Sequence, residues 1–251
     1  MLQLKKITYT FAIALLAVIA GIYFNAQALN IGLVVTATGR YIEFVQPLLE
    51  SANKHFCRNH NVTYFIFTDG QAPQADNVVS IFQKRLGWPY DTMMRFEIYA
   101  SHADAFKDMD YLFACDADML FVDTVGDEIL GDLVGTLHPG YVGSRGTYET
   151  NLRSTACIPS NQGTHYFAGG FNGGKTANYL AMANEITKNI HTDLDRGVIA
   201  IWHDESHLNR YFATNKPTVT LSPSYCYWQG KILPFTQRLV ALNKDHAQYR
   251  R

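Results

Sequence analysis

The sequence carries little charge and almost no excess of one sign. Only 17% of its 251 residues are charged, and 21 basic against 22 acidic side chains leave a formal net charge of -1. This balance excludes the broad basic surface with which proteins bind nucleic acid. Phosphate groups, if bound, must therefore be neutralised at a local site.

Cysteines are also few, and no linker or repeat interrupts the chain. The four cysteines show no Cys-x-x-Cys spacing and are too sparse for a disulfide framework in a chain of this length, which predicts mostly buried thiols. A hydrophobic content of 47% is enough for one large core. We therefore expect a single domain over residues 30–251.

The N-terminus differs from the rest because it contains a long uncharged run. Lys5 and Lys6 precede the apolar segment Ile7–Phe24, which is long enough to cross a bilayer. Lysines before the span predict a signal-anchor within residues 1–29, a cytoplasmic N-terminus and a single-pass membrane protein. The alternative is a signal peptide cleaved near Ala26-Gln27-Ala28, which would make the protein secreted or periplasmic.

Beyond Asn30, strand-like and helix-like stretches alternate, which predicts an α/β domain. The order of the expected elements is a strand at 31–36, a helix at 41–56, strands at 62–67 and 78–82, a helix at 88–106 and a strand at 111–115. In open α/β sheets, ligands bind outside the carboxyl ends of the strands. The residues that follow the strand at 111–115 are therefore candidates for chemistry.

Two carboxylates, Asp116 and Asp118, follow this strand directly. Oxygen ligands so spaced suit a hard divalent cation, which can also bind two phosphate oxygens and stabilise a diphosphate as a leaving group. Asp-x-Asp triplets are common, however, and many only cap a turn. The position after a buried strand favours the metal site.

A second polar cluster, Trp202–Asn209, opens a predicted helix that extends to Phe212. His203 and His207 are four residues apart and would share a helical face, so a zinc-dependent hydrolase is one interpretation. A plain amphipathic helix, with Asp204 and Glu205 opposing the macrodipole in its first turn, is the other.

The third feature is the glycine-rich segment Phe167–Gly174. It lacks the Gly-x-x-x-x-Gly-Lys pattern of a phosphate-binding loop. Its small residues can let the backbone approach a ligand closely, or they can mark a bulged strand that packs against a neighbouring element.

Together these motifs resemble glycosyltransferase family 6, the family of the histo-blood-group A and B transferases and the α1,3-galactosyltransferases. The resemblance covers nearly all of the chain beyond Asn30. Its landmarks are Ala37, Tyr41, Trp88, Met94-Arg95, Asp116-Ala117-Asp118, Gly135–Gly140, Phe167–Gly174, Trp202–Asn209, Leu221-Ser222-Pro223, Lys244, His246 and Arg250.

The resemblance implies a single Rossmann-like domain of the glycosyltransferase A type and a uridine diphosphate sugar as donor. Asp116 and Asp118 would hold Mn²⁺, with Mg²⁺ as the alternative ion. A C-terminal tail would close over the donor. The implied donor-binding residues are Ala37, Tyr41, Arg95, Asp116, Asp118, Ala168, Gly169, Gly170, Asp204, Lys244 and Arg250.

The resemblance also implies a retaining reaction that forms an α1,3 linkage to a galactose-containing glycan. Glu205 matches the catalytic carboxylate, either as a nucleophile or as an electrostatic stabiliser of the reacting carbon. His138, Thr147, Trp202 and His203 would line the acceptor site. A non-catalytic carbohydrate-binding relative is a further alternative.

Donor choice within the family depends on the residues that match Ala168, Gly169 and Gly170. All three are small here, which predicts N-acetylgalactosamine over galactose as the transferred sugar, because filling a tight pocket with one extra carbon costs about 1 to 3 kcal/mol. Trp228 stands where the vertebrate members have an acidic residue that touches the acceptor. The acceptor glycan is therefore left open.

Overall fold

The computed structural model describes residues 27–250. The predicted membrane span, Ile7–Phe24, and the residue Ala26 of the predicted cleavage site lie outside the described residues. From residue 27 to residue 250, no helix has both the length and the apolar character needed to cross a bilayer.

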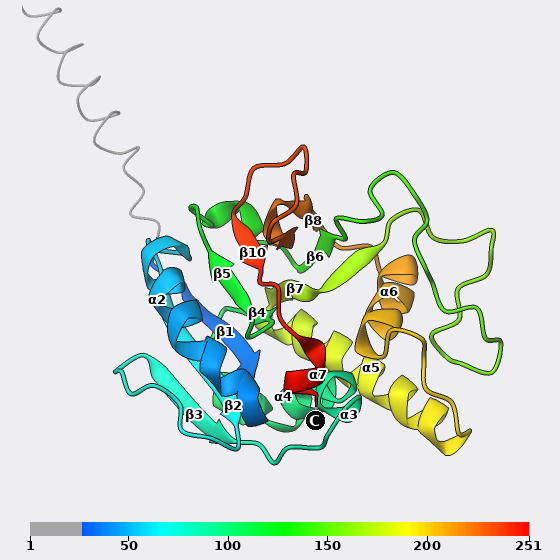
Figure 1. Cartoon of the computed structure of the whole chain (residues 1–251), viewed down its shortest axis with the longest axis horizontal. Helices are drawn as coiled ribbons and strands as arrows, with labels where there is room; N and C mark the ends of the chain where they lie inside the picture. The colour runs from blue at the N-terminus through cyan, green and yellow to red at the C-terminus, as the bar shows by residue number, and fades with distance from the viewer. Residues whose placement is uncertain (1–26, 251) are drawn as a thin grey trace, which may run out of the picture.

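A mixed seven-stranded sheet forms the centre of the molecule, in the order β3-β2-β1-β4-β7-β6-β8 (Figure 1). The first four strands in this order are mutually parallel, β7 is antiparallel to both of its neighbours, and β8 is parallel to β6. Their bounds are β1 Asn30–Thr36, β2 Asn61–Thr68, β3 Val78–Phe82, β4 Tyr111–Cys115, β6 Leu133–Leu137, β7 Phe167–Lys175 and β8 Val219–Leu221.

Helices cover both faces of this sheet and produce two apolar cores. On one face α2 (Val45–His55) packs against alternate residues of β1 such as Leu33 and Val35. On the other face α4 (Arg95–Ser101), α5 (Thr176–Asp195) and α6 (Asp204–Thr214) pack around Val34 and its neighbours. This three-layer arrangement confirms the α/β fold class.

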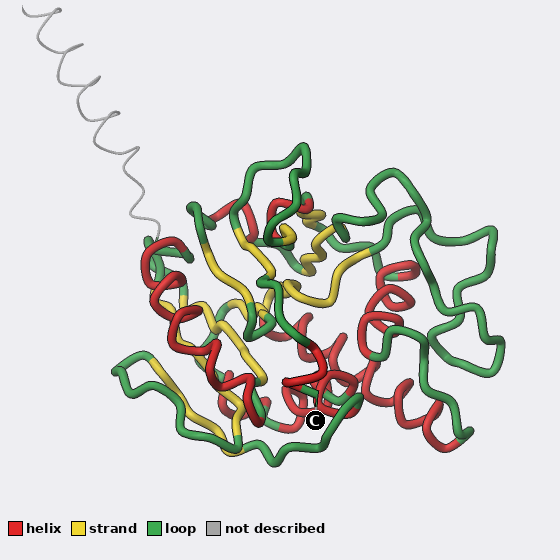
Figure 2. The backbone as a smooth tube through the Cα atoms, in the orientation of Figure 1, coloured by secondary structure: helices red, strands yellow, loops and turns green. Residues whose placement is uncertain are grey.

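A small three-stranded sheet and several short helices complete the described chain. The small sheet has the order β5-β10-β9 and lies beside the carboxyl end of β4. Its strands and the remaining helices are β5 Met119–Phe121, β9 Tyr227–Trp228, β10 Leu239–Ala241, η1 Gly39–Phe44, α3 Tyr90–Met93, η2 Ala103–Phe106, η3 Asp127–Ile129, η4 Pro223–Tyr225 and α7 His246–Tyr249. Between β6 and β7 the chain follows a long loop that projects beside α6 (Figure 2).

Two predicted helices differ from the observed ones. The segment 41–56 begins as the 3₁₀ helix η1 and becomes α-helical only at Val45. The segment 88–106 is divided into α3, α4 and η2, after a cis peptide bond between Trp88 and Pro89. Burial is continuous from Met93 to Phe96, so this stretch has no single apolar face that would hold one straight helix.

Candidate active site

The candidate site begins where β1 and β4 end side by side. A small cavity of about 40 Å³ lies there, lined by residues that include Thr36, Thr38, Cys115 and Asp116. The Asp116 N–H donates to the Gly170 carbonyl at 2.9 Å, which holds the carboxylate next to β7. The antiparallel pairing of β7 with β4 thus brings the glycine-rich strand and the Asp116 segment together at the carboxyl end of β4.

Arg95 connects this segment to the start of α6. Its guanidinium pairs with Asp116 at 2.8 Å and with Asp204 at 2.9 Å, and it also donates to the Gly169 carbonyl at 3.1 Å. The side chain is only 10% exposed, so these charges are poorly screened by water. The planar guanidinium group of arginine, with five N–H donors, can make all three contacts at once, whereas the ammonium group of a lysine cannot.

The Gly169 peptide is the second connection between the two segments. Its N–H donates to Glu205 Oε2 at 2.8 Å, and its carbonyl accepts from Asn172 Nδ2 at 3.0 Å as well as from Arg95. The backbone can turn in this way because β7 is bulged: Thr136 pairs with Ala168, whereas the preceding Gly135 pairs with Asn172. The bulged-strand interpretation is confirmed, and the bulge itself builds the site.

Glu205 is the most perturbed carboxyl group of the site. Burial raises its pKa to about 7, although the Gly169 N–H and the Tyr166 hydroxyl both favour its ionised form. The Tyr166 hydroxyl donates to Glu205 Oε1 at 2.8 Å. No basic side chain of the described residues forms an ion pair with Glu205. A carboxylate so placed is more basic than an ordinary glutamate, and its pKa lies in the range that general bases and nucleophiles use near neutral pH.

Asp204, the first residue of α6, is also buried and has a different partner. Burial raises its pKa to about 6, and the Arg95 guanidinium opposes this shift. Because Arg95 also pairs with Asp116, its charge offsets only part of the effect of burial on the pKa of Asp204. Asp204 and Glu205 both follow His203, whose left-handed backbone (φ 53°) starts the helix abruptly.

Asp118 lies on the other side of the turn, beside the C-terminal tail. Burial and the neighbouring Asp116 raise its pKa, and Lys244 Nζ contacts its carboxylate. For Lys244, burial lowers the pKa but the charge of Asp118 outweighs it, so the net shift is upward. Asp116 and Asp118 thus form an acidic pair with cations on two sides.

This acidic pair fits a divalent cation of the Mn²⁺ or Mg²⁺ type. Within residues 27–250, no group of three or more His, Cys, Asp or Glu side chains is arranged to hold a metal ion. Two carboxylates are sufficient for an ion that takes its other ligands from phosphate and water. The pair does not by itself form a closed site of the structural zinc kind.

The two histidines of the zinc hypothesis do not share a helical face, because His203 precedes α6. The His203 ring contacts the Trp88 ring, with centroids 4.9 Å apart. His207 lies inside the helix, 3% exposed, with Nε2 3.7 Å from the Asp193 carboxylate, and burial lowers its pKa to about 4. The spacing argument for zinc therefore fails on the backbone conformation of His203.

Three of the predicted acceptor residues, Trp202, Thr147 and His138, belong to a chain of contacts that reaches Glu205 through Tyr166. Trp202 Nε1 donates to Thr147 Oγ1 at 2.9 Å, and Thr147 Oγ1 donates to the Tyr141 hydroxyl at 3.1 Å. The Tyr141 ring stacks on His138, which in turn contacts Tyr166 and Trp228. Burial lowers the pKa of His138 to about 4, so the imidazole is neutral near pH 7.

The C-terminal tail crosses the site near α3 and α4 (Figure 1). The Arg250 guanidinium lies 3.6 Å above the Trp88 ring, and Lys244 lies 5.3 Å from the centre of the Tyr41 ring. Tyr249 packs on Tyr41 at 5.4 Å. The tail therefore brings Lys244 and Arg250 beside Tyr41 and Trp88, and closure of the tail over a donor stays a prediction.

The remaining predicted donor residues are buried within this assembly. Ala37 is fully buried and its carbonyl accepts from Thr68, while Ala168 is 2% exposed. A Cβ added to Gly170 would lie 3.2 Å from Asp116 Oδ2 and 3.4 Å from Met119 Sδ. A Cβ at Gly169 would meet Glu205 at 3.5 Å, an ordinary contact. Gly170 is thus the more crowded of the two glycines.

Sequence reasoning missed Tyr166, which holds Glu205, because no motif contains it. The sequence offers one indication of it. Tyr166 directly precedes β7 and stands two residues before Ala168, and residues two apart in an extended chain point to the same side. Reasoning also missed Glu149, a buried carboxylate that accepts from the Ile201 N–H at 2.7 Å. This hydrogen bond fixes the loop that precedes Trp202, His203 and α6.

Comparison with known proteins agrees with this arrangement. The chain is 38% identical over 245 residues to rat histo-blood group ABO system transferase 1, covering 90% of this chain and 70% of the relative. It is 37% identical over 235 residues to human globoside alpha-1,3-N-acetylgalactosaminyltransferase 1, with coverages of 86% and 67%. It is 32% identical over 219 residues to mouse glycosyltransferase 6 domain-containing protein 1, with coverages of 82% and 70%. The model of glycosyltransferase family 6 matches residues 8–251, and the chain belongs to this family.

Proposed function

We propose that this family 6 glycosyltransferase is a retaining enzyme that transfers N-acetylgalactosamine from a uridine diphosphate donor to the 3-hydroxyl of a galactoside in α1,3 linkage. The observation that carries the proposal is the pair of connections, Arg95 and the Gly169 peptide, that joins the Asp116 segment to Asp204 and Glu205. One sugar diphosphate can contact both segments only if they lie this close.

The two segments divide the work of the reaction. Asp116 and Asp118 would hold a divalent cation, which would supply positive charge to neutralise the diphosphate as a leaving group. Arg95 orients Asp116 and Asp204 together, and Asp204 accepts hydrogen bonds from the donor sugar. Lys244 and Arg250 supply positive charge from the tail, near the diphosphate.

Glu205 acts at the anomeric carbon. As the bond from this carbon to the diphosphate breaks, positive charge develops at the carbon, and the buried carboxylate either attacks it or stabilises it electrostatically. The acceptor hydroxyl then forms the new bond to the anomeric carbon, which breaks the bond to Glu205 if one has formed, and its proton passes to an oxygen of the released diphosphate. The Tyr166 hydroxyl and the Gly169 N–H fix both oxygens of Glu205, so the carboxylate cannot rotate away.

The donor assignment rests on the small side chains at positions 168, 169 and 170. An acetamido group needs room, and Ala168, Gly169 and Gly170 add almost no side-chain volume. The human relative is a globoside alpha-1,3-N-acetylgalactosaminyltransferase, which supports this choice of sugar. We also propose that residues 1–29 anchor the catalytic domain to a membrane.

The test is a panel of uridine diphosphate sugars with Mn²⁺ and simple galactosides, in which mass spectrometry and NMR identify the product. We expect an α1,3-linked N-acetylgalactosaminide, and we expect Asp118→Asn to abolish its Mn²⁺-dependent formation. A tenfold preference for the galactose donor would remove the donor assignment. Sugar binding without turnover of any donor would remove the transferase assignment.

A further inference from the structure

A buried carboxylate joins the two segments that carry the predicted acceptor residues Thr147 and Trp202. The first segment belongs to the long loop between β6 and β7, and the second is the turn before α6. Glu149, which is 7% exposed, accepts from the Asn151 N–H of its own loop at Oε1 and from the Ile201 N–H of the turn at Oε2, both at 2.7 Å. This side chain therefore holds the loop and the turn against each other.

The far end of the same loop is held by a different carboxylate, Asp193, in the last turn of α5. Asp193 is 1% exposed, its Oδ1 accepts from the Thr155 N–H at 2.6 Å, and the Ser154 hydroxyl donates to its Oδ2. Its backbone carbonyl accepts from the Val198 N–H at 2.8 Å, where the chain leaves α5 for the turn. The loop and the turn are thus attached to α5 independently of Glu149.

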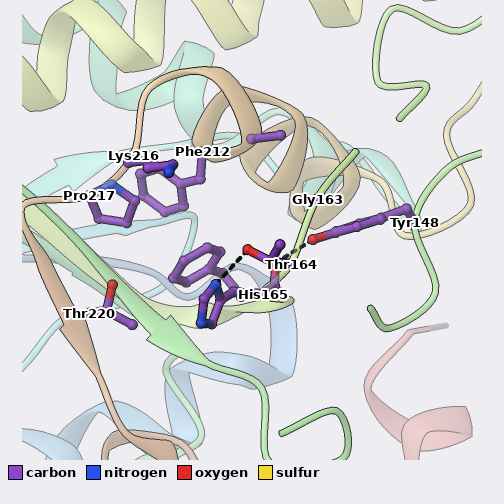
Figure 3. Close-up of a pocket in the computed structure, with 10 residues that line it drawn as sticks. Tyr148, Gly163, Thr164, His165, Phe212, Lys216, Pro217 and Thr220 are labelled. Atoms are coloured by element: carbon purple, nitrogen blue, oxygen red, sulfur yellow. Dashed lines mark hydrogen bonds between the residues drawn. The ribbon is translucent and has the colours of Figure 1, made fainter. Parts of the chain in front are cut away.

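The residues on either side of Thr147 are also fixed to the body of the protein. The Tyr148 hydroxyl donates to the His165 carbonyl (Figure 3). Gly146 has a left-handed backbone (φ 71°) and lies directly on the Tyr166 ring, where a Cβ would come within 2.5 Å. The backbone of Thr147 therefore has a defined position against which the turn can be set.

Trp202 depends on this setting more than Glu205 does. Its side chain is 45% exposed, and its Nε1 donates to Thr147 Oγ1 at 2.9 Å across the two segments. A hydrogen bond of this length requires that the segments keep their separation. The Glu205 carboxylate is held instead by the Gly169 N–H and the Tyr166 hydroxyl. A change at Glu149 should therefore affect the side of Trp202 and leave the reacting carboxylate in place.

We propose that Glu149 is a positioning residue for the acceptor, which fixes the separation between Thr147 and Trp202 and thereby the affinity for the galactoside. The inference rests on the proposed function, which places both of these residues at the acceptor. A carboxylate suits this task because each of its oxygens accepts one N–H group. A glutamine has the same shape but only one acceptor oxygen, so one of the two backbone N–H groups would face an NH₂ group and lose its partner.

The test compares Glu149→Gln with the parent chain and with Glu185→Gln, which removes a carboxylate at an exposed position of α5. Initial rates with the N-acetylgalactosamine donor, Mn²⁺ and methyl β-galactoside give kcat and the acceptor KM. Donor hydrolysis is measured without acceptor. We expect Glu149→Gln to raise the acceptor KM about tenfold and to change kcat and donor hydrolysis by less than about threefold, because only acceptor binding is weakened. Glu185→Gln should change none of these quantities.

A second measurement follows Trp202 without any substrate. The chain has three tryptophans, so labelling with 5-fluorotryptophan gives a simple ¹⁹F NMR spectrum, in which Trp202→Phe identifies the signal of Trp202. We expect Glu149→Gln to shift or broaden this signal. The signal of Trp228, which contacts His138, should stay unchanged and serves as the internal reference.

Glu149→Asp provides a second variant, because its side chain is one methylene shorter and cannot reach both N–H groups. It carries the same measurements if circular dichroism shows that Glu149→Gln does not fold. The proposal is overturned if the Trp202 signal is unchanged, if the acceptor KM stays within about twofold of the parent value, or if kcat and donor hydrolysis fall as much as KM rises. The last pattern would indicate general damage to the site.

Failure of the proposed function gives a different result, namely a parent chain that turns over no donor. Binding of methyl β-galactoside, measured by NMR titration without donor, then decides the role of Glu149. Binding that is about tenfold weaker in Glu149→Gln supports the positioning role, because it reports on acceptor affinity alone. Equal binding by the parent and the variant, or no binding by the parent, overturns it.

Discussion

The site contains two pairs of carboxyl groups in contrasting environments. Asp116 and Asp118 contact cationic side chains, Arg95 and Lys244. Glu205, in the other pair, has only a backbone N–H and a phenol as partners, and burial raises its pKa to about 7. Asp204 is intermediate, because it shares Arg95 with Asp116.

This contrast shows that carboxyl groups in one site can have two different roles when their surroundings differ. The carboxylates that contact cations suit a metal diphosphate, whereas Glu205, buried without a cation, becomes more basic and suits a reacting carbon. Arg95 lies between them and keeps the two environments at a fixed separation. Each prediction below alters one side of this contrast.

The largest effect is expected from Glu205→Gln, which removes the charge but keeps the shape. Glutamine can still accept from the Gly169 N–H, so the site remains assembled. We expect the kcat of transfer to fall about a thousandfold or more, because the group at the reacting carbon is lost. Donor affinity in the presence of Mn²⁺, measured by calorimetry, should stay within about threefold of the parent value. A kcat within tenfold of the parent value would contradict the assignment of Glu205.

The second-largest effect that we expect is a dependence of kcat/KM on pH. If Glu205 must be ionised, kcat/KM should rise about tenfold per pH unit up to its pKa of about 7 and then level off. Initial rates between pH 5 and pH 9 measure this, with Mn²⁺ held constant. A profile that is flat between pH 5 and pH 8 would show that the carboxylate does not titrate in this range.

The same titration predicts a change in stability. The folded-state pKa of Glu205 is raised above the ordinary value of 4.5, so its stabilising contribution is complete below pH 4.5 and is lost as the pH rises through about 7. Glu205→Gln does not titrate and should therefore gain stability relative to the parent over this window. Chemical denaturation at pH 4.5 and pH 8 tests the sign.

A smaller effect is expected from Arg95→Lys, which keeps the positive charge but loses the planar guanidinium group with its several hydrogen-bond donors. One ammonium cannot bridge Asp116, Asp204 and the Gly169 carbonyl together, so the two carboxylate pairs should lose their fixed separation. We expect kcat/KM to fall about thirtyfold and the protein to lose about 2 kcal/mol of stability. Lys175→Arg, at an exposed ion pair with Asp132, is the matched control and should change neither quantity.

The smallest effect is expected from Gly170→Ala. The added methyl group would lie 3.2 Å from Asp116 Oδ2 and would narrow the space beside the donor. We expect the preference for the N-acetylgalactosamine donor over the galactose donor to fall about fivefold, in line with the modest discrimination of steric pockets. Competition between the two donors measures the ratio. A ratio that rises would refute the size argument.

Much of the fold follows from local patterns in the sequence. The strands at 31–36, 62–67, 78–82 and 111–115 are confirmed within one residue at each end, because each is a short apolar run bounded by polar residues. The rule that ligands bind at the carboxyl ends of such strands directed attention to Asp116, and its place beside the glycine-rich strand comes from the antiparallel pairing of β4 with β7, which the rule does not address.

The connections within the site could not be predicted, because they depend on neighbours distant in sequence. The bulge of β7 appears only when β4 and β6 pair with it on either side. The left-handed conformation of His203 follows the loop that the Glu149 hydrogen bond to Ile201 holds in place. No pattern in the sequence predicted this conformation. Helical spacing for His203 and His207 was therefore misleading.

The most direct test of the account is a crystal structure with Mn²⁺ and an unreactive analogue of the uridine diphosphate donor. The account predicts that Asp116 and Asp118 hold the metal with the diphosphate, and that the anomeric carbon lies within about 3.5 Å of a Glu205 carboxylate oxygen. A donor whose sugar lies in a different pocket from Glu205 would contradict it.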